Sequence, residues 1–376
     1  MEIKGKNKGA YWYIGVIFIL IFAFSVLCWK QFLGAVSQEI WLSEEVENAS
    51  FVRQMDEVVT QVDELWYEKI YWKKYLNAIH SVFVYKSLKE VPGNQVLAGK
   101  NNWLFYVEKS ENDTIADYEG TNRYTKEEMG EFLQVVMENQ KQMEERGIQF
   151  AVLVAPNKEN VYPEYMPDYY SHNPVSNTDV LVEYLKKGGV SIVSSKEDMK
   201  NLTDRYQLYY PYDSHWNQLG AYVSVGSVLQ QLQIPTKSLE SREMISYPLK
   251  GNYHEGAWSD LANMSGLHYI MDDEMEFEVK GTPKIDWNQY MINHYSHQIS
   301  HYSNENAAVD KKVFLIGDSF RTAMVPAMCE VFQEVYVIHR SDYLPAMLDE
   351  TQPDYVILEY VERYVNQMKD FRLVPF

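Results

Sequence analysis

The chain has 376 residues, 46% of them hydrophobic, and its 34 basic and 53 acidic side chains give a formal net charge of −19 at pH 7. This acidity excludes a broad nucleic-acid-binding surface, because contacts to phosphates need clustered Lys and Arg side chains. The two cysteines, Cys28 and Cys329, are too few for a disulfide framework, a four-thiolate zinc site or an iron–sulfur site. Stability must therefore come from a packed core, to which 30 tyrosines, 15 phenylalanines and 9 tryptophans can contribute.

An uncharged apolar segment lies at residues 11–29. A helix of this length spans about 28 Å, close to the hydrocarbon thickness of a bilayer. Trp12 and Trp29 lie at its ends, which is typical of the membrane interface, and the lysines before it favour a cytoplasmic N-terminus. We therefore expect residues 1–30 to be a cytoplasmic tail and single transmembrane anchor, with the following chain extracytoplasmic. The alternative is a cleaved signal peptide, because Ala35-Val36-Ser37 resembles a small-residue cleavage site.

Residues 31–93 are predicted to form a helical stalk or linker. Apolar side chains recur there near helical spacing, and neither Gly nor Pro occurs between residues 38 and 90. The segment Val91-Pro92-Gly93 then ends the helical pattern.

Residues 94–376 are predicted to form one α/β domain. Continuous apolar runs alternate there with helical patterns, which favours three layers with helices on both faces of a mainly parallel sheet. The strand candidates are Gln149–Ala155, Val190–Val193, Val313–Ile316, Val335–Ile338 and Tyr355–Leu358, and the helical patterns are Lys126–Arg146, Thr178–Lys187 and Gln218–Gln231. Residues 240–310 interrupt this alternation with Gly, Asn, Tyr and His, and we expect an excursion or small subdomain there.

A serine motif, Gly317-Asp318-Ser319-Phe320, directly follows the strand candidate that ends at Ile316. Ligands of open α/β sheets bind at the carboxyl ends of the strands, so Ser319 would stand exposed there as a nucleophile. Backbone N–H groups around Ser319 and Phe320, and the positive end of the following helix, are candidates for stabilising an oxyanion. The alternative is that Ser319 only caps this helix.

A second motif places Asp213 and His215 two residues apart, in the segment Tyr212-Asp213-Ser214-His215-Trp216-Asn217 before a helical pattern. In extended backbone both side chains project the same way, so the carboxylate can hold the imidazole and stabilise its protonated form. Trp216 is a candidate wall of the pocket that excludes water. The alternative is that Asp213 caps the helix and His215 is a surface histidine.

Together, the two motifs resemble the SGNH-hydrolase-like domains of alginate O-acetyltransferases and their Gram-positive relatives, including the group named for a DHHW motif. In that superfamily the nucleophile is the serine of a Gly-Asp-Ser block, and the histidine and aspartate come from a separate block. Here Asp213 and His215 precede Ser319, and this order resembles the acetyltransferase branch. The resemblance implies an SGNH, flavodoxin-like fold, a Ser319–His215–Asp213 triad and no cofactor.

Shorter segments extend the resemblance over about residues 80–370. They are similar to the family's entry segment, to the loop after its first strand and to two further family segments. These are Gly99–Tyr106, Ala155–Lys158 with Val161–Glu164, Ser259–Ala262 and Glu362–Tyr364. The chain departs from the DHHW group at Ser214, where that group has His, and we find no counterpart of the Gly and Asn oxyanion blocks of many SGNH esterases.

Four charged residues near strand ends, Lys158, Glu359, Glu362 and Arg363, are candidates for lining the pocket. The alternative for each of them is a solvated charged turn.

Three histidines, His294, His297 and His301, have the spacing of one helical face, which would permit a metal site. The surrounding stretch has poor helical propensity, and no acidic or thiol ligand nearby completes the set. We therefore expect a polar surface there and no metal.

The family resemblance implies a reaction and its partners. His215 would take the proton of Ser319 as the serine attacks an acyl donor, and a glycan hydroxyl would then collect the acyl group. Because acetyl-CoA is cytoplasmic, the resemblance implies a multi-pass membrane O-acyltransferase as acetyl donor, and a cell-envelope polysaccharide or exopolysaccharide as acceptor. The leading hypothesis is thus a membrane-anchored O-acetyltransferase. The alternatives are a carbohydrate esterase with the same triad and a catalytically silent scaffold of a polysaccharide-modification complex.

Overall fold

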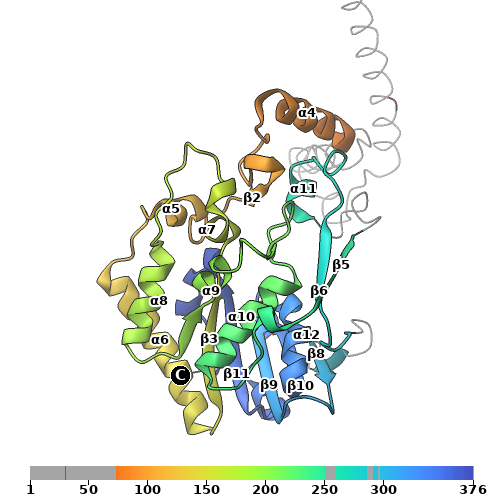
Figure 1. The fold of residues 1–376 in the computed structure, drawn as a ribbon. Helices are drawn as coiled ribbons and strands as arrows, with labels where there is room; N and C mark the ends of the chain where they lie inside the picture. The colour runs from red at the N-terminus through yellow and green to blue at the C-terminus, as the bar shows by residue number, and fades with distance from the viewer. Residues whose placement is uncertain (1–29, 31–72, 250–258, 286–290, 295–296, 376) are drawn as a thin grey trace, which may run out of the picture. The chain divides into compact units, whose positions relative to one another are not determined.

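The computed structural model describes residue 30 and residues 73–249, 259–285, 291–294 and 297–375 (Figure 1). The chain divides into two compact units, Met1–His80 and Ser81–Phe376, and the second contains both sequence motifs. Within the described ranges, no helix is both long and apolar enough to cross a bilayer. The anchor and cleavage site expected from the sequence, and the stalk up to residue 72, lie outside these ranges.

The second unit is built on a seven-stranded sheet with the order β4-β3-β11-β9-β10-β8-β7. The first five strands in this order are parallel to one another, and the last two add an antiparallel hairpin at the β10 edge. The strands are β3 (Gln149–Ala155), β4 (Ile192–Ser194), β7 (Met291–His294), β8 (His297–Ser303), β9 (Val309–Gly317), β10 (Phe332–His339) and β11 (Tyr355–Val361). The sheet is thus mainly parallel, as predicted, and the β7–β8 hairpin makes it a mixed sheet.

The helices lie on both faces of this sheet, with α6 and α8 on one side and α10 and α12 on the other (Figure 1). The α-helices are α4 (Lys73–Leu88), α5 (Thr114–Glu119), α6 (Lys126–Glu145), α7 (Lys158–Val161), α8 (Asn177–Lys187), α9 (Lys196–Lys200), α10 (Gln218–Gln231), α11 (Asp260–Met264), α12 (Arg321–Val331) and α13 (Ala346–Thr351). Five 3-10 helices complete them: η1 (Lys100–Asn102), η2 (Pro163–Tyr165), η3 (Leu239–Ser241), η4 (Arg340–Asp342) and η5 (Glu362–Lys369).

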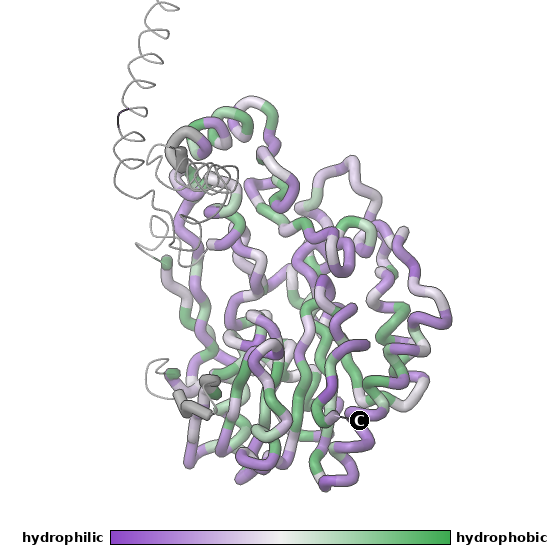
Figure 2. The backbone as a smooth tube through the Cα atoms, turned by 180° about the vertical axis from the view of Figure 1, so that it is seen from behind, coloured by the Kyte–Doolittle hydropathy of each residue, from purple (hydrophilic) through white to green (hydrophobic). Residues whose placement is uncertain are grey.

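Alternation along the central strand β9 explains the three layers. Val313 and Leu315 pack with residues of α10 and α12, whereas Phe314 and Ile316 pack with residues of α6, α8 and α13. Successive side chains of a strand point to opposite faces, so a run of apolar residues needs a cover on both. The apolar residues accordingly gather along the central strands (Figure 2).

The parallel strands have the order of a flavodoxin-like sheet when they are counted cyclically from β9. Counted in this way, β10, β9, β11, β3 and β4 are strands 2-1-3-4-5. The point where the order reverses lies between β9 and β11, and ligands of such sheets bind outside the carboxyl ends of the strands there. The serine motif follows β9 directly, so the fold places Ser319 at this point.

The predicted excursion at residues 240–310 contains two further antiparallel pairs. One pair, β5 (Met244–Pro248) and β6 (Met275–Val279), forms a separate two-stranded sheet, and a third small sheet is made by β1 (Val96–Ala98) and β2 (Leu104–Tyr106). The other pair is the β7–β8 hairpin, in which His294 pairs with His297. The three histidines with helical spacing therefore lie on strands and do not share a helical face, in keeping with the poor helical propensity of this Asn- and Ser-rich stretch.

Candidate active site

The turn from β9 into α12 presents Ser319 at the carboxyl edge of the sheet. Gly317 is required there, because a Cβ at this position would lie 2.4 Å from Glu359 Oε2 and 2.9 Å from Glu359 Cβ. The Asp318 carboxylate accepts hydrogen bonds from the N–H of Phe320 (3.0 Å) and of Val361 (2.9 Å). This turn is therefore fixed from both sides, while the Ser319 side chain stays exposed.

The histidine motif lies in a loop that is held at both ends. Tyr209 and Trp216 form an antiparallel bridge, and Asn217 then caps α10 by accepting hydrogen bonds from two backbone N–H groups. Inside the loop the buried ammonium of Lys158 donates to the carbonyl oxygens of Tyr210 (3.1 Å), Pro211 (3.1 Å) and Asp213 (2.7 Å). All three ammonium protons are used, so Lys158 fixes the backbone on which Asp213 stands.

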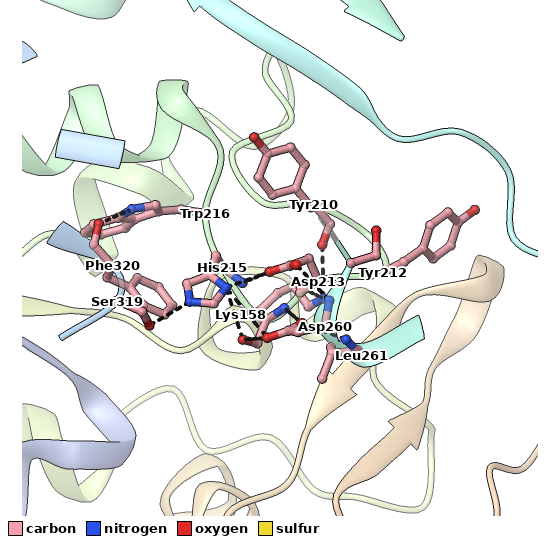
Figure 3. A network of polar contacts seen from close by, with 12 residues as sticks. Lys158, Tyr210, Tyr212, Asp213, His215, Trp216, Asp260, Leu261, Ser319 and Phe320 are labelled. Carbon is pink, nitrogen blue, oxygen red and sulfur yellow. Dashed lines mark hydrogen bonds and ion pairs between the residues drawn. The ribbon is translucent and has the colours of Figure 1, made fainter. Parts of the chain in front are cut away.

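Serine, histidine and aspartate meet as the sequence predicts (Figure 3). His215 Nε2 lies 2.7 Å from Ser319 Oγ, and His215 Nδ1 lies 2.7 Å from Asp213 Oδ1. The same Asp213 oxygen also accepts from the backbone N–H of His215, at 2.9 Å. The imidazole thus has one nitrogen on a carboxylate and the other on an exposed hydroxyl, which is the arrangement that activates a serine nucleophile.

The electrostatics of the histidine pair favour its ionised form. Burial opposes the charge of His215, but its hydrogen bond to Asp213 and the charges of Asp213 and Asp260 outweigh burial, so the pKa of His215 is raised. Burial likewise opposes the charge of Asp213, but the hydrogen bond and charge of His215 outweigh it and lower the pKa of Asp213. An imidazole with a raised pKa is a stronger base for the serine proton.

Trp216 and Phe320 join the two motifs through one hydrogen bond. Trp216 Nε1 donates to the carbonyl oxygen of Phe320 at 3.0 Å, and the Phe320 ring lies 4.9 Å from the His215 ring between centroids. Trp216 borders the cavity, as its predicted role as a wall requires. The N–H of Phe320 already donates to Asp318, so it is engaged and does not face a developing oxyanion. The N–H of Ser319 is therefore the remaining candidate for the oxyanion donor in this turn.

The four charged residues that were candidates for lining the pocket lie behind the site instead. Their exposed fractions are 2% for Lys158, 0% for Glu359, 0% for Glu362 and 5% for Arg363, and none of them borders the cavity. The alternative prediction, that these residues belong to solvated charged turns, is also wrong, because all four are buried. Charged groups this deeply buried are retained only where other groups hold them, and each of these has such partners.

The two glutamates among them support backbone at the carboxyl edge of the sheet. Glu359 Oε2 accepts the N–H of Asp318 at 2.9 Å, and burial together with the Asp318 charge raises the pKa of Glu359 well above its usual value. Glu362 Oε2 accepts the N–H of Asn157 at 2.7 Å and the amide of Asn160 at 2.6 Å. Both side chains therefore brace the loops that carry the site rather than contact a substrate.

Arg363 lies under the serine turn. The centre of its guanidinium is 5.0 Å from the Phe320 ring centroid and 5.2 Å from that of Tyr106, as in cation–π pairs. One of its nitrogens lies 3.5 Å from Asn157 Oδ1. Arg363 thus supports Phe320 from behind, and its charge partly opposes protonation of His215.

A cavity of about 1050 Å³ opens beside the triad. His215 and Ser319 line it, and the β5–β6 pair contributes a wall that includes Tyr247, Glu276 and Glu278. Sites for small molecules typically have volumes of about 300–1000 Å³, so this one has room for several sugar rings. The chemistry available here is attack of Ser319 on an acyl group that enters from this cavity.

One residue of the site, Asp260, was not among the sequence candidates. It begins α11, and its Oδ2 lies 3.6 Å from His215 Nδ1 and 2.5 Å from Ser214 Oγ. Its only sequence signal was its position in the family-like segment Ser259–Ala262, which indicated no role. Ligand atoms of Asp213, His215 and Asp260 lie within 4.8 Å of one another. A cation among them would take His215 Nδ1 from its hydrogen bond to Asp213, so the group serves the imidazole better than a metal.

One family model matches part of this chain. Residues 96–276 match the family model described as "SGNH hydrolase-like domain, acetyltransferase AlgX". Among curated protein sequences, none matches this chain significantly.

Solved structures share the fold. Bacillus cereus PatB1 superposes with a TM-score of 0.53 at 14% identity, over 74% of this chain and 100% of that one. A second PatB1 structure, with a sulfonyl adduct, gives 0.51 at 14% identity, over 74% of this chain and 97% of that one. A DHHW family protein from Eubacterium siraeum gives 0.49 at 16% identity, over 77% and 99%. Residues 96–276 are therefore similar to the SGNH hydrolase-like domain of the acetyltransferase AlgX, and the PatB1 structures share the fold of this chain.

Proposed function

We propose that this protein is a membrane-anchored, extracytoplasmic O-acetyltransferase that transfers acetyl groups to hydroxyl groups of a cell-envelope polysaccharide or exopolysaccharide. The observation that carries the proposal is the chain of contacts from Ser319 Oγ through His215 to Asp213, with 2.7 Å at each step. It stands beside a cavity large enough for a glycan. The AlgX acetyltransferase family model supports the transfer reaction over other chemistries of the fold.

The first half of the reaction forms an acyl-enzyme. His215 Nε2 takes the proton of Ser319 as Oγ attacks the carbonyl carbon of the acetyl donor, and Asp213 stabilises the resulting imidazolium. The tetrahedral oxyanion is stabilised by the N–H of Ser319 at the start of α12. When the bond to the donor breaks, the leaving group takes the proton from His215, and acetyl-Ser319 remains.

The second half repeats these steps with a sugar hydroxyl. His215, neutral again, takes the hydroxyl proton as the sugar oxygen attacks acetyl-Ser319, and the proton then returns to Ser319 Oγ as the ester bond breaks. Water in place of the sugar would give net hydrolysis. Transfer therefore depends on how well the cavity positions the acceptor and excludes water.

The location and the donor belong to the same proposal. The apolar segment at residues 11–29 supports an anchor with the catalytic unit outside, and the AlgX family model supports an outward-facing domain. Acetyl groups would then have to cross the membrane, so the donor is proposed to be a multi-pass membrane O-acyltransferase. The anchor would keep the two proteins in one membrane.

The test uses the full-length chain, purified in mild detergent and incubated with p-nitrophenyl acetate with and without an oligosaccharide. Acetylated sugar, detected by mass spectrometry, is expected for the wild type and is lost in Ser319→Ala, His215→Ala and Asp213→Asn. Release of p-nitrophenol with no acetylated sugar from any acceptor would instead support the esterase. Equal inactivity of the wild type and Ser319→Ala towards several donors would support the silent scaffold.

A covalent probe tests the nucleophile independently of the acceptor. PatB1 has been solved with a sulfonyl adduct, and sulfonyl fluorides modify activated serines. We expect phenylmethanesulfonyl fluoride to modify Ser319 and to leave Ser319→Ala unmodified. The matched control is Ser171→Ala, which removes another exposed serine and should not change the labelling. Modification of Ser319→Ala to the same extent would contradict the assignment.

A further inference from the structure

Asp260 makes a set of contacts centred on the histidine motif. Its Oδ1 accepts the N–H of Ser214 at 2.7 Å and the N–H of Leu261 at 2.6 Å, and its Oδ2 accepts the Ser214 hydroxyl at 2.5 Å. The same Oδ2 lies 3.6 Å from His215 Nδ1. The carboxylate is therefore locked in position by three donors while one of its oxygens faces the imidazole (Figure 3).

The backbone of Asp260 also orients the carboxylate of Asp213. Its N–H donates to Asp213 Oδ2 at 2.9 Å, while Asp213 Oδ1 accepts from His215 Nδ1 and from the His215 N–H. Both oxygens of Asp213 are thus occupied, one by the imidazole and one by the start of α11. Asp260 therefore supplies a second negative charge near His215 and also holds the carboxylate of Asp213 in place.

We infer that Asp260 is a positioning residue that, with Asp213, places His215 between two carboxylates and stabilises its protonated form during turnover. This inference rests on the proposed function of Ser319 and His215. The imidazolium that forms when Ser319 loses its proton then faces two negative charges at 2.7 and 3.6 Å. Ser214 has a specific part in this, because its hydroxyl bonds Asp260 where the DHHW group has His.

The other charged groups around His215 do not replace Asp260. The charge of Arg363, from η5, disfavours protonation of the imidazole. Lys158 and Glu274 act on Asp213 rather than on His215, and their charges oppose one another there. The charge of Asp260 adds to that of Asp213 in raising the pKa of His215.

The test is the pKa of His215 in Asp260→Asn, measured by NMR titration of the full-length chain in detergent. Asn keeps the shape and one acceptor oxygen but removes the charge, so the pKa should fall by about one unit. The acidic limb of kcat/KM for p-nitrophenyl acetate should move to lower pH by the same amount, and its plateau should fall about tenfold. The inference would be overturned if the plateau of kcat/KM falls while the pKa of His215 and the acidic limb of the pH profile stay unchanged. That outcome is expected if Asp260 has only a structural role.

Two further variants separate charge from packing. Asp273→Asn removes an exposed acid of the same excursion and should leave the pKa of His215 and the limb unchanged. Ser214→Ala keeps the charge of Asp260 but removes its hydroxyl partner, so it should lower the plateau without lowering the pKa. If Ser214→Ala lowers the pKa as far as Asp260→Asn does, the charge is not the cause and the inference fails.

This design distinguishes the inference from the proposed function. The NMR pKa is measured whether or not the wild type turns over, so an inactive wild type would refute only the acetyltransferase proposal. A turnover that depends on Ser319, with no pKa change in Asp260→Asn, would refute only the role of Asp260. Thermal unfolding of each variant, compared with the wild type, identifies a variant that does not fold.

Discussion

Replacing Lys158 by Met tests how the catalytic aspartate is held. The ammonium donates to three main-chain carbonyls of the loop before His215, and its Nζ lies 5.3 Å from the ring centroid of Phe105. Met has a similar length and fills the same space without a donor. The substitution therefore removes the hydrogen bonds and leaves the packing nearly unchanged.

The structure sets the size of the effect. The Pro211 carbonyl keeps the N–H of Leu104, at 2.9 Å, whereas the carbonyls of Tyr210 and Asp213 lose the ammonium from which they accept. A hydrogen bond to a charged group contributes about 1.5–3 kcal/mol, and the cost at these two carbonyls is partly offset because the buried ammonium no longer needs desolvation. We expect the free energy of unfolding to fall by about 3 kcal/mol. The relaxed backbone at Asp213 should lower kcat/KM at least tenfold.

The assays are urea unfolding and p-nitrophenyl acetate hydrolysis under conditions where the variant is folded. The matched control is Lys196→Met, which removes another buried lysine, one that pairs with Asp179 of α8 and not with the loop of His215. This control should lose stability while its activity per folded molecule stays within about twofold of the wild type. The reasoning is refuted if Lys158→Met keeps full activity in its folded fraction, because the lysine then does not position Asp213.

Three further outcomes are expected. Gly317→Ala should lower the free energy of unfolding, and it should lower kcat/KM more than tenfold, because its Cβ would lie 2.4 Å from Glu359 Oε2. A folded, fully active variant would contradict this. Trp216→Phe removes the indole N–H from a main-chain carbonyl behind the nucleophile, so unfolding free energy should fall by about 1 kcal/mol in urea titrations. The pH dependences of stability and turnover should oppose one another. The raised pKa of His215 adds stability that is complete below about pH 6.5, the pKa of His in the unfolded chain, and this stability is lost as pH rises through the pKa of His215 in the folded protein. The lowered pKa of Asp213 adds stability that is lost as pH falls through the pKa of Asp213 in the folded protein. Turnover needs neutral His215, so activity should rise with pH where this stability falls; parallel changes in thermal unfolding and rate would contradict the ion pair.

The fold elements that the sequence predicts correctly are those with a continuous apolar run or a clear helical period of apolar residues. The apolar run Gln149–Ala155 is a strand with the predicted bounds, and Gln218–Gln231 is a helix with the predicted bounds. The hairpin of β7 and β8 lies at the sheet edge, and its polar sequence gives no clear apolar period. Composition indicated an interruption there, but it could not indicate that the interruption adds strands to the main sheet.

The four buried charges show why candidate site residues near a motif are hard to rank. A charged residue after a strand is usually solvated, so Glu359 and Glu362 suggested either a pocket wall or an exposed turn. Neither fits, because both glutamates are needed inside the fold as acceptors of backbone N–H groups. Glu359 also lies so close to Gly317 that a Cβ there would meet it. Such partners come from segments up to 205 residues away, and only the three-dimensional structure brings them together.

Strand order explains why the triad itself could be predicted. Ser319 and His215 are 104 residues apart, and the histidine comes first along the chain. In the cyclic numbering from β9, however, the serine follows strand 1, and the histidine loop follows strand 5 (β4) and leads into α10. Helices α10 and α12 pack against each other on one face of the sheet, so the loops at their N-terminal ends meet above the carboxyl edge. The contact depends on where these two helices begin, not on the order in which the chain reaches them, and a sequence that specifies both helix starts therefore specifies the site.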